Sequence, residues 1–274
     1  SLFVNSASEI GADGNWMTSD DGLMPLNTSV LKHAGTSSGA PSNDIVGETR
    51  YTTPTIGAYK SQVLSSTTLY DGNGSSNGVE STVPGKSSIS ISNFTVPAGD
   101  DRLLVVATVN FSNTSTIGVS FGSRTMTSIR TVSFGAANLV VWTLKLPTST
   151  YTSAAITDYI TASSSPNTRY FTSISAQSFH NINQTTPIDG IVSSTATATS
   201  SSETVTSAVN DLVVDFIAVN SAGTSGYSIT ANATQTETVN DNSGNHNLGQ
   251  QYISLGSSVE EGAASVNMDW SWST

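Results

Sequence analysis

Short apolar or alternating runs recur along the chain from residue 87 onward, with turn residues between them. Runs of this length and spacing are typical of the strands of a β-sandwich or jelly roll. The pattern predicts an all-β fold with a β-sandwich or jelly-roll-like domain over residues 87–274. The ten clearest runs are Ile89 to Val96, Leu103 to Val109, Ile117 to Phe121, Leu139 to Leu146, Ala154 to Ile160, Phe171 to Phe179, Leu212 to Val219, Tyr227 to Ala231, Tyr252 to Leu255 and Ala264 to Trp272.

Two of these runs alternate regularly. Apolar side chains stand at every second position from Val140 to Leu146 and from Val266 to Trp272, with Thr143 and Lys145 among the residues between them. Because successive side chains of a strand point to opposite faces, each run predicts an antiparallel strand with one buried face.

Two other runs, Leu103 to Ala107 and Leu212 to Ile217, are apolar at nearly every position. They predict central strands that are covered on both faces. The two runs also resemble each other, because Asp101-Arg102-Leu103-Leu104-Val105-Val106 aligns with Asn210-Asp211-Leu212-Val213-Val214. This likeness indicates either an internal duplication or convergence of pseudo-symmetric strands within one sandwich.

The chain before residue 87 has a different character. Residues 1–66 are rich in Gly, Asn, Asp and Pro, and the polar stretch 67–86 contains the turn-forming sequence Asp71-Gly72-Asn73-Gly74. We therefore expect a terminal segment over residues 1–66, a linker or long loop over 67–86, and the sandwich domain over 87–274.

Composition favours strands over helices. Ser and Thr make up 86 of the 274 residues, and only 11% of the residues are charged. Ser, Thr and Asn compete for backbone hydrogen bonds, and β-branched side chains lose rotamer freedom in a helix.

Charge and cysteine content narrow the chemistry. A net charge of −11 with nine Lys and Arg excludes nucleic acid as a partner, because phosphate contacts need a cationic surface. The absence of cysteine excludes disulfides, thiol nucleophiles and Cys-ligated metals. The sequence contains neither a signal peptide nor a membrane span, so no membrane insertion is expected. The first residue is Ser rather than Met, as in a processed or excised product.

Three pieces of residues 1–60 carry a family resemblance: Leu2 to Asn5, Gly11 to Leu23, and Asp44 to Arg50 followed by Ile56 to Tyr59. In their order and spacing they resemble the C-terminal end of a right-handed parallel β-helix, as in bacterial surface proteins with pectate-lyase-like repeats and a C-terminal sorting anchor. Thr55 and Lys60 stand where such proteins usually carry acidic residues, so a role for those carboxylates is not implied. The resemblance implies a terminal β-helix rung and cap over residues 1–66.

A terminal rung needs a partner. Each coil of a β-helix is stabilised by stacking on a neighbouring coil, so a last coil cannot bury its apolar face alone. The resemblance therefore implies self-association, or packing on upstream coils or a neighbouring domain, through the N-terminal segment.

The rest of the chain is similar to a β-sandwich module of large secreted bacterial proteins. The residues that carry this likeness are Pro97 to Val106, Val141-Trp142, Asn183 to Pro187 and Gly262 to Val266. Together with the low charge and the many hydroxyls, the two resemblances imply a secreted or cell-surface location. They imply no activity.

A glycine-punctuated acidic loop is the strongest candidate for chemistry. Closely spaced side-chain oxygens on a flexible turn are the hard ligands that calcium prefers, although the spacing differs from that of an EF-hand. The same residues also form ordinary turns, in which Asp caps its own backbone. The loop therefore predicts either plain turns or a calcium site with ligands from Asp13, Asn15, Asp20 and Asp21.

The aromatic residues offer a second kind of site. Trp270 and Trp272 form either part of the core or a sugar-stacking platform, and their alternation with polar residues in a regular strand favours the core. Four tyrosines near strand ends and loops are better placed to contact a glycan: Tyr151, Tyr159, Tyr170 and Tyr227.

Catalytic groups are sparse. Nucleophilic catalysis needs a base beside the nucleophile and a third group that orients the base, yet the chain has only His33, His180 and His246 and no Gly-x-Ser-x-Gly elbow. Glu260 and Glu261 precede a turn and are expected to be solvated rather than to form a glycosidase pair. No catalytic residue is predicted.

Taken together, these features favour a non-catalytic extracellular structural or adhesive module that self-assembles into a fibre. The alternative is a carbohydrate-binding module of a secreted polysaccharide-degrading enzyme whose catalytic β-helix lies upstream.

Overall fold

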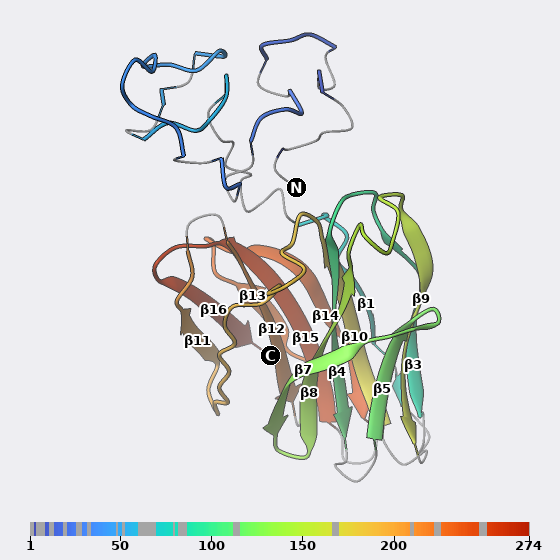
Figure 1. Cartoon of the computed structure of the whole chain (residues 1–274). Coiled ribbons are helices and arrows are strands. Elements are labelled where there is room, and N and C mark those ends of the chain that lie inside the picture. Colours follow the sequence, from blue (N-terminus) through green and yellow to red (C-terminus); the bar gives the residue numbers. More distant parts are fainter. Residues whose placement is uncertain are drawn as a thin grey trace. The chain divides into compact units, whose positions relative to one another are not determined.

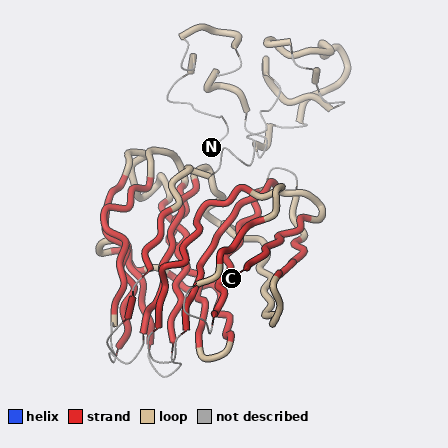
Figure 2. Tube along the Cα trace, turned by 180° about the vertical axis from the view of Figure 1, so that it is seen from behind, coloured by secondary structure: helices blue, strands red, loops and turns tan. Residues whose placement is uncertain are grey.

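The computed structural model describes residues 3, 9–10, 14–18, 21–25, 29–31, 34–47, 49–50, 53–59, 70–78, 80–81, 87–111, 116–165, 170–208, 211–221, 226–246 and 251–273. The chain divides into two compact units, Ser1–Ser65 and Ser66–Thr274. Among the described residues there is no helix, and hence none long and apolar enough to cross a membrane (Figure 2).

The first unit consists of loops and turns in its described part. Two isolated bridges, Phe3 with Pro25 and Asn43 with Thr49, are the strand-like pairings found there. The Arg50 guanidinium holds one loop together by donating to the carbonyl oxygens of Asn43, Thr55, Gly57 and Ala58.

The second unit contains four sheets (Figure 1). Outer sheet 1 comprises β3 (Ser88–Val96), β9 (Ile156–Ser165), β5 (Thr116–Phe121) and β6 (Arg124–Thr125), in that order. Inner sheet 1 comprises β1 (Ser75–Gly78), β10 (Tyr170–Phe179), β4 (Arg102–Phe111), β8 (Ala137–Leu146) and β7 (Thr127–Phe134). Inner sheet 2 comprises β12 (Leu212–Ser221), β15 (Gln251–Glu261), β14 (Thr236–His246) and β2 (Glu80–Ser81), and outer sheet 2 comprises β11 (Ser200–Val205), β16 (Val266–Ser273) and β13 (Ser228–Ala231).

Apolar side chains hold these sheets together as a stack of four layers. Outer sheet 1 packs on inner sheet 1 through a core that includes Phe121, Ile160 and Leu104. The two inner sheets share a central interface in which strands β4 and β15 meet. Inner sheet 2 packs on outer sheet 2 through a smaller core that includes Val213 and Trp270.

The two halves of the stack have the same topology. In the first half, β3, β9 and β5 are neighbours in the outer sheet and β4, β8 and β7 in the inner sheet. In the second half, the outer sheet has β11, β16 and β13 in the places of β3, β9 and β5, and the inner sheet has β12, β15 and β14 in the places of β4, β8 and β7. The equivalent strands follow the same order along the chain. The second unit therefore contains two structural repeats, of which the first has an additional strand, β10, beside β4.

The repeats pack through equivalent faces. Leu103 and Val105 of β4 belong to the same apolar cluster as Leu212 and Val214, which are their counterparts on β12. A pseudo-twofold relation, in which the same positions of two like units meet, explains this arrangement. The likeness between the two runs thus coincides with a duplication of topology.

The predicted all-β, sandwich-like fold is confirmed, and so is the single buried face of β16. For β8 the prediction of a single buried face is wrong, because Leu139 and Val141 on its other face pack in the central interface between the inner sheets. All ten residues of β4 are buried, as expected of a central strand. The prediction that β12 is also a central strand is wrong in one respect. Side chains cover both of its faces, but among the described strands β12 lies at the edge of its sheet, and most of its residues are partly exposed.

The sequence pattern did not predict several of the strands. Strands β7, β11 and β14 carry many polar residues, and β1 and β2 lie in the stretch expected to be a linker. They form because β1 pairs with β10 and β2 pairs with β14, so neighbouring strands supply the hydrogen bonds that their own sequences do not predict.

Candidate functional site

The acidic loop of the first unit is organised around Asp21. Its carboxylate is buried and accepts hydrogen bonds from the backbone N–H groups of Met17 (2.7 Å) and Thr18 (3.2 Å) and from the hydroxyl of Tyr59. Burial, together with the neighbouring Asp21 carboxylate, raises the pKa of the Tyr59 hydroxyl. Asp21 therefore ties residues 17–18 to the segment that carries Tyr59.

These contacts bear on the predicted calcium ligands. Asn15 is exposed, Asp21 points inward, and Asp13 and Asp20 lie outside the described residues. One Asp21 oxygen is saturated by the three donors, whereas the other has no hydrogen-bond partner among the described atoms. Within the described part of the chain, no three acidic or histidine side chains gather as a metal would require. The four-residue calcium site stays a prediction.

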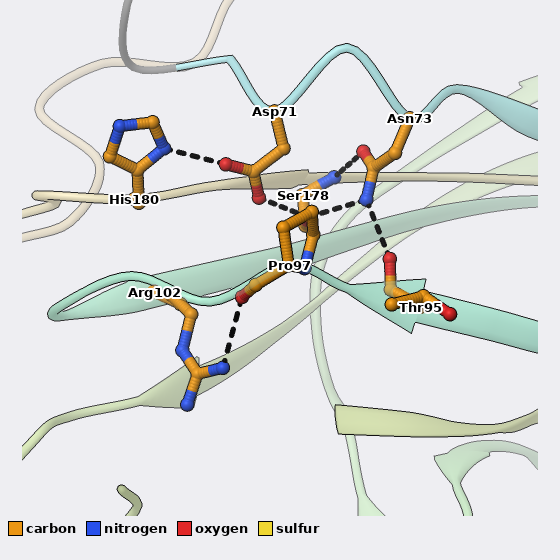
Figure 3. Close-up of polar contacts among 7 residues, drawn as sticks. All are labelled: Asp71, Asn73, Thr95, Pro97, Arg102, Ser178 and His180. Carbon is orange, nitrogen blue, oxygen red and sulfur yellow. Dashed lines mark hydrogen bonds and ion pairs between the residues drawn. The ribbon is translucent and has the colours of Figure 1, made fainter. Parts of the chain in front are cut away.

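A polar cluster fastens the start of the second unit to the end of β10 (Figure 3). The buried carboxylate of Asp71 lies 2.6 Å from His180 Nδ1 and accepts a hydrogen bond from the Ser178 hydroxyl. Asn73 accepts from the Ser178 N–H (3.0 Å) and donates to the Thr95 carbonyl (2.9 Å). We call Asp71, Asn73, Ser178 and His180 the polar pin.

The polar pin contains Ser, His and Asp but in the wrong order for nucleophilic catalysis. A triad requires the imidazole between the hydroxyl and the carboxylate. In this cluster the carboxylate lies between the other two, and Asn73 also donates to the Ser178 hydroxyl (2.7 Å). Ser178 is fully buried, so its oxygen is closed to a substrate.

Arg102 supports the same end of the first repeat. Its guanidinium is buried and donates to the carbonyl oxygens of Pro97 (3.1 Å), Thr152 (2.6 Å) and Ala154 (2.7 Å). Burial lowers its pKa, partly offset by the negative charge of Asp71. In the second repeat Asp211 stands at the equivalent position and accepts from the Ala208 N–H (2.9 Å). Each residue stabilises the turn that enters its strand.

Asp215 on β12 is a carboxylate enclosed between inner sheet 2 and outer sheet 2. It accepts hydrogen bonds from the Trp270 indole (2.6 Å) and from the Ser258 hydroxyl (2.6 Å) and N–H (3.0 Å). Burial raises its pKa, and these hydrogen bonds partly oppose the rise. The sequence pattern did not single out Asp215 because its partners lie 43 and 55 positions away.

The aromatic candidates divide between core and surface. Trp270 is buried, and Trp272 packs against the same cluster, as the alternation predicted. Gly256 makes room for Trp270, because a Cβ there would lie 2.8 Å from its ring. Tyr151 and Tyr227 are partly buried against apolar clusters, whereas Tyr159 is 55% exposed; the side chain of Tyr170 lies outside what the structure describes.

The remaining titratable candidates do not converge. His33 and the side chain of His246 lie outside the described parts of the chain. Glu260 and Glu261 lie at the end of β15, where Glu261 is exposed as expected and Glu260 is half-buried, accepting from the Thr234 hydroxyl (3.3 Å).

The edge of β12 is the clearest candidate for an interaction site. Its equivalent in the first repeat, β4, pairs with β8 on one side and with β10 on the other. β12 pairs with β15 on one side, and the described residues place no strand on the other. The five residues from Val214 to Ala218 are all partly exposed, whereas their counterparts on β4 are all buried. Its one charged side chain, Asp215, is bonded to Ser258 and Trp270.

No model of a known protein family matches this chain, and comparison with curated proteins and with solved structures likewise finds no match. The fold and the contacts of its own residues are therefore the basis on which its function is inferred.

Proposed function

We propose that this chain is a non-catalytic structural or adhesive module of an extracellular bacterial assembly. The observation that carries the proposal is the stack of four sheets joined by three apolar interfaces. Two repeats that share a central core are held against relative movement, which suits a part that bears load or presents a surface.

The polar contacts support the same view. Asp71, Ser178 and Arg102 are buried, and Asp215 is half-buried. The partners of all four lie in the protein, and each joins segments that are distant in sequence. Their chemistry stabilises the fold.

The first unit exposes apolar side chains that suit contact with a neighbour. Trp16, Met17 and Val30 are all more than half exposed. Trp16 and Met17 are adjacent in the chain, and neighbouring exposed apolar residues commonly mark a surface that associates with another protein. They support association through the N-terminal segment.

Sedimentation velocity over a wide concentration range, with negative-stain electron microscopy, tests the proposal. We expect association that rises with concentration and is weakened by the double substitution Trp16→Ser and Met17→Ser. Tyr159→Ser, at an exposed aromatic of the second unit, is the matched control. A monomer at every concentration, with no ordered assembly in the images, would contradict the proposal.

Carbohydrate binding is the second candidate, and the exposed ring of Tyr159 on β9 is the observation in its favour. An exposed aromatic face complements the apolar face of a pyranose. A glycan array separates the two functions, since binding that is lost in Tyr159→Ala supports only this candidate.

A further inference from the structure

The place beside β12 corresponds to the place that β10 fills in the first repeat. In that repeat β10 pairs antiparallel with β4, and it contacts β3 of the outer sheet on one side and β14 of the other repeat on the opposite side. By the equivalence of the repeats, the open place beside β12 has β11 on one side and β7 on the other. We call this place the β12 slot.

Contacts of the described residues agree with this placement. Val205 of β11 packs against the cluster that contains Val213, and Phe134 of β7 packs in the same cluster as Phe216 and Ala218. The slot is therefore bounded by β12, β7 and β11 (Figure 1). A second sheet brought edge-on would collide with β7 and β11, so the slot fits a single extended segment.

The segment that connects β10 to β11 passes near the slot without pairing in it. Arg130 of β7 donates to the Ser193 hydroxyl of this segment at 2.5 and 3.0 Å. Ile191 and Val192 are 42% and 47% exposed, and residues 189–199 form no strand. The segment leaves the outward edge of β12 without a strand pairing among the described residues.

We propose that the β12 slot binds one extended strand, antiparallel to β12, donated by a neighbouring polypeptide of the assembly. This deepens the proposed function, on which the source of the strand rests. An open edge offers backbone N–H and C=O groups in register, and an added strand completes the sheet. Edges are usually protected by outward-facing charge, and β12 has none to repel the incoming strand.

The side chains of β10, which fills the equivalent place in the first repeat, indicate the chemistry of the strand that binds in the β12 slot. On β10, Ile174 and Ala176 face the outer-sheet core, whereas Ser173, Ser175 and Gln177 are buried on the opposite face. The donated strand is accordingly uncharged, with apolar residues toward β11 and small polar residues toward β7. Main-chain hydrogen bonds supply the affinity, and the alternation supplies the specificity.

A fluorescent peptide with the sequence of β10, Tyr170 to Phe179, carrying solubilising lysines at both ends, is the probe for the full-length chain. We expect saturable binding by anisotropy. An added strand uses only one of its two edges, so N-methylation of one alternate set of amides should weaken binding at least about tenfold, while methylation of the other set has little effect. Equal loss from both sets, or no binding, would overturn the proposal.

Disulfide trapping locates the peptide. Because the chain contains no cysteine, only the introduced cysteines can form the cross-link. We expect a peptide with a central cysteine to cross-link to Val214→Cys but not to Thr230→Cys, which lies on the edge strand β13. Preferential cross-linking at position 230 would overturn the proposal. A rapid disulfide within the double variant Ser193→Cys and Val214→Cys would do so too, because the chain's own connecting segment would then fill the slot.

The two proposals fail separately. If the protein assembles but the peptide does not bind, the strand-donation proposal alone is wrong. If the peptide binds but the protein stays monomeric at every concentration, the slot stands and the proposed function is contradicted.

Discussion

Strands β4 and β12 occupy equivalent places in two repeats and have similar sequences, yet their surroundings differ. β4 has a neighbour on both edges and is buried throughout, whereas β12 has one neighbouring strand in the described part of the chain and is partly exposed over most of its length. The comparison teaches that an apolar run specifies cover on its two faces and says little about its edges. The edges depend on whether another segment of the fold, such as β10, reaches them.

The largest expected effect on stability comes from two equivalent leucines, Leu103 on β4 and Leu212 on β12. Leu103 is 5% exposed and Leu212 is partly exposed, although both pack in the central interface. We expect Leu103→Ala to lower the free energy of unfolding by about 3 kcal/mol and Leu212→Ala by about half as much, because a partly exposed site leaves a smaller cavity. Urea unfolding of both variants gives the two values. Equal losses would show that the exposed edge has no effect on stability.

The polar pin, at the end of β10 in the first repeat, offers the next largest effect. The Asp71 side chain is only 2% exposed and has both His180 and Ser178 as partners. Asp71→Ala should therefore cost about 2 kcal/mol, because it leaves buried donors without an acceptor. The control is Asp100→Ala, which removes an exposed carboxylate and should cost less than about 0.5 kcal/mol. Similar losses in the two variants, measured by urea unfolding, would contradict the role given to the pin.

Asp215 gives a smaller, pH-dependent effect that is confined to β12, since the equivalent residue on β4 is Val106. Its pKa in the folded state is raised above the ordinary value of 3.8, so the folded protein holds this proton to a higher pH than the unfolded chain does. The contribution of Asp215 to stability is therefore present below about pH 4 and is lost as the pH rises through its folded-state pKa.

The substitution Asp215→Asn isolates this contribution, because Asn keeps an acceptor for the Trp270 indole but does not ionise. We expect the free energy of unfolding of the parent minus that of the variant to decrease by about 1 kcal/mol between pH 4 and pH 7. A difference that stays constant or increases over this range would contradict the raised pKa.

The sequence pattern predicted the strands whose own side chains alternate or are uniformly apolar, such as β4, β8 and β16. It did not predict β14, whose Asn240 and Asp241 are polar but pair with Gly256 and Leu255 of β15. The polar pin was equally hidden, because Asp71 and Ser178 are 107 positions apart. Contacts of this kind depend on the tertiary fold, which a local pattern does not encode.

Native-state hydrogen exchange tests the central claim, that the edge of β12 is open where β10 covers the equivalent edge of β4. The amides of β4 from Leu103 to Phe111 lie between two paired strands, whereas alternate amides of β12 face the open slot. We expect protection near the global limit along β4 and, along β12, alternate amides that exchange at least about a hundredfold faster. Uniform protection of both strands would contradict the account, since it would mean that the slot beside β12 is already filled.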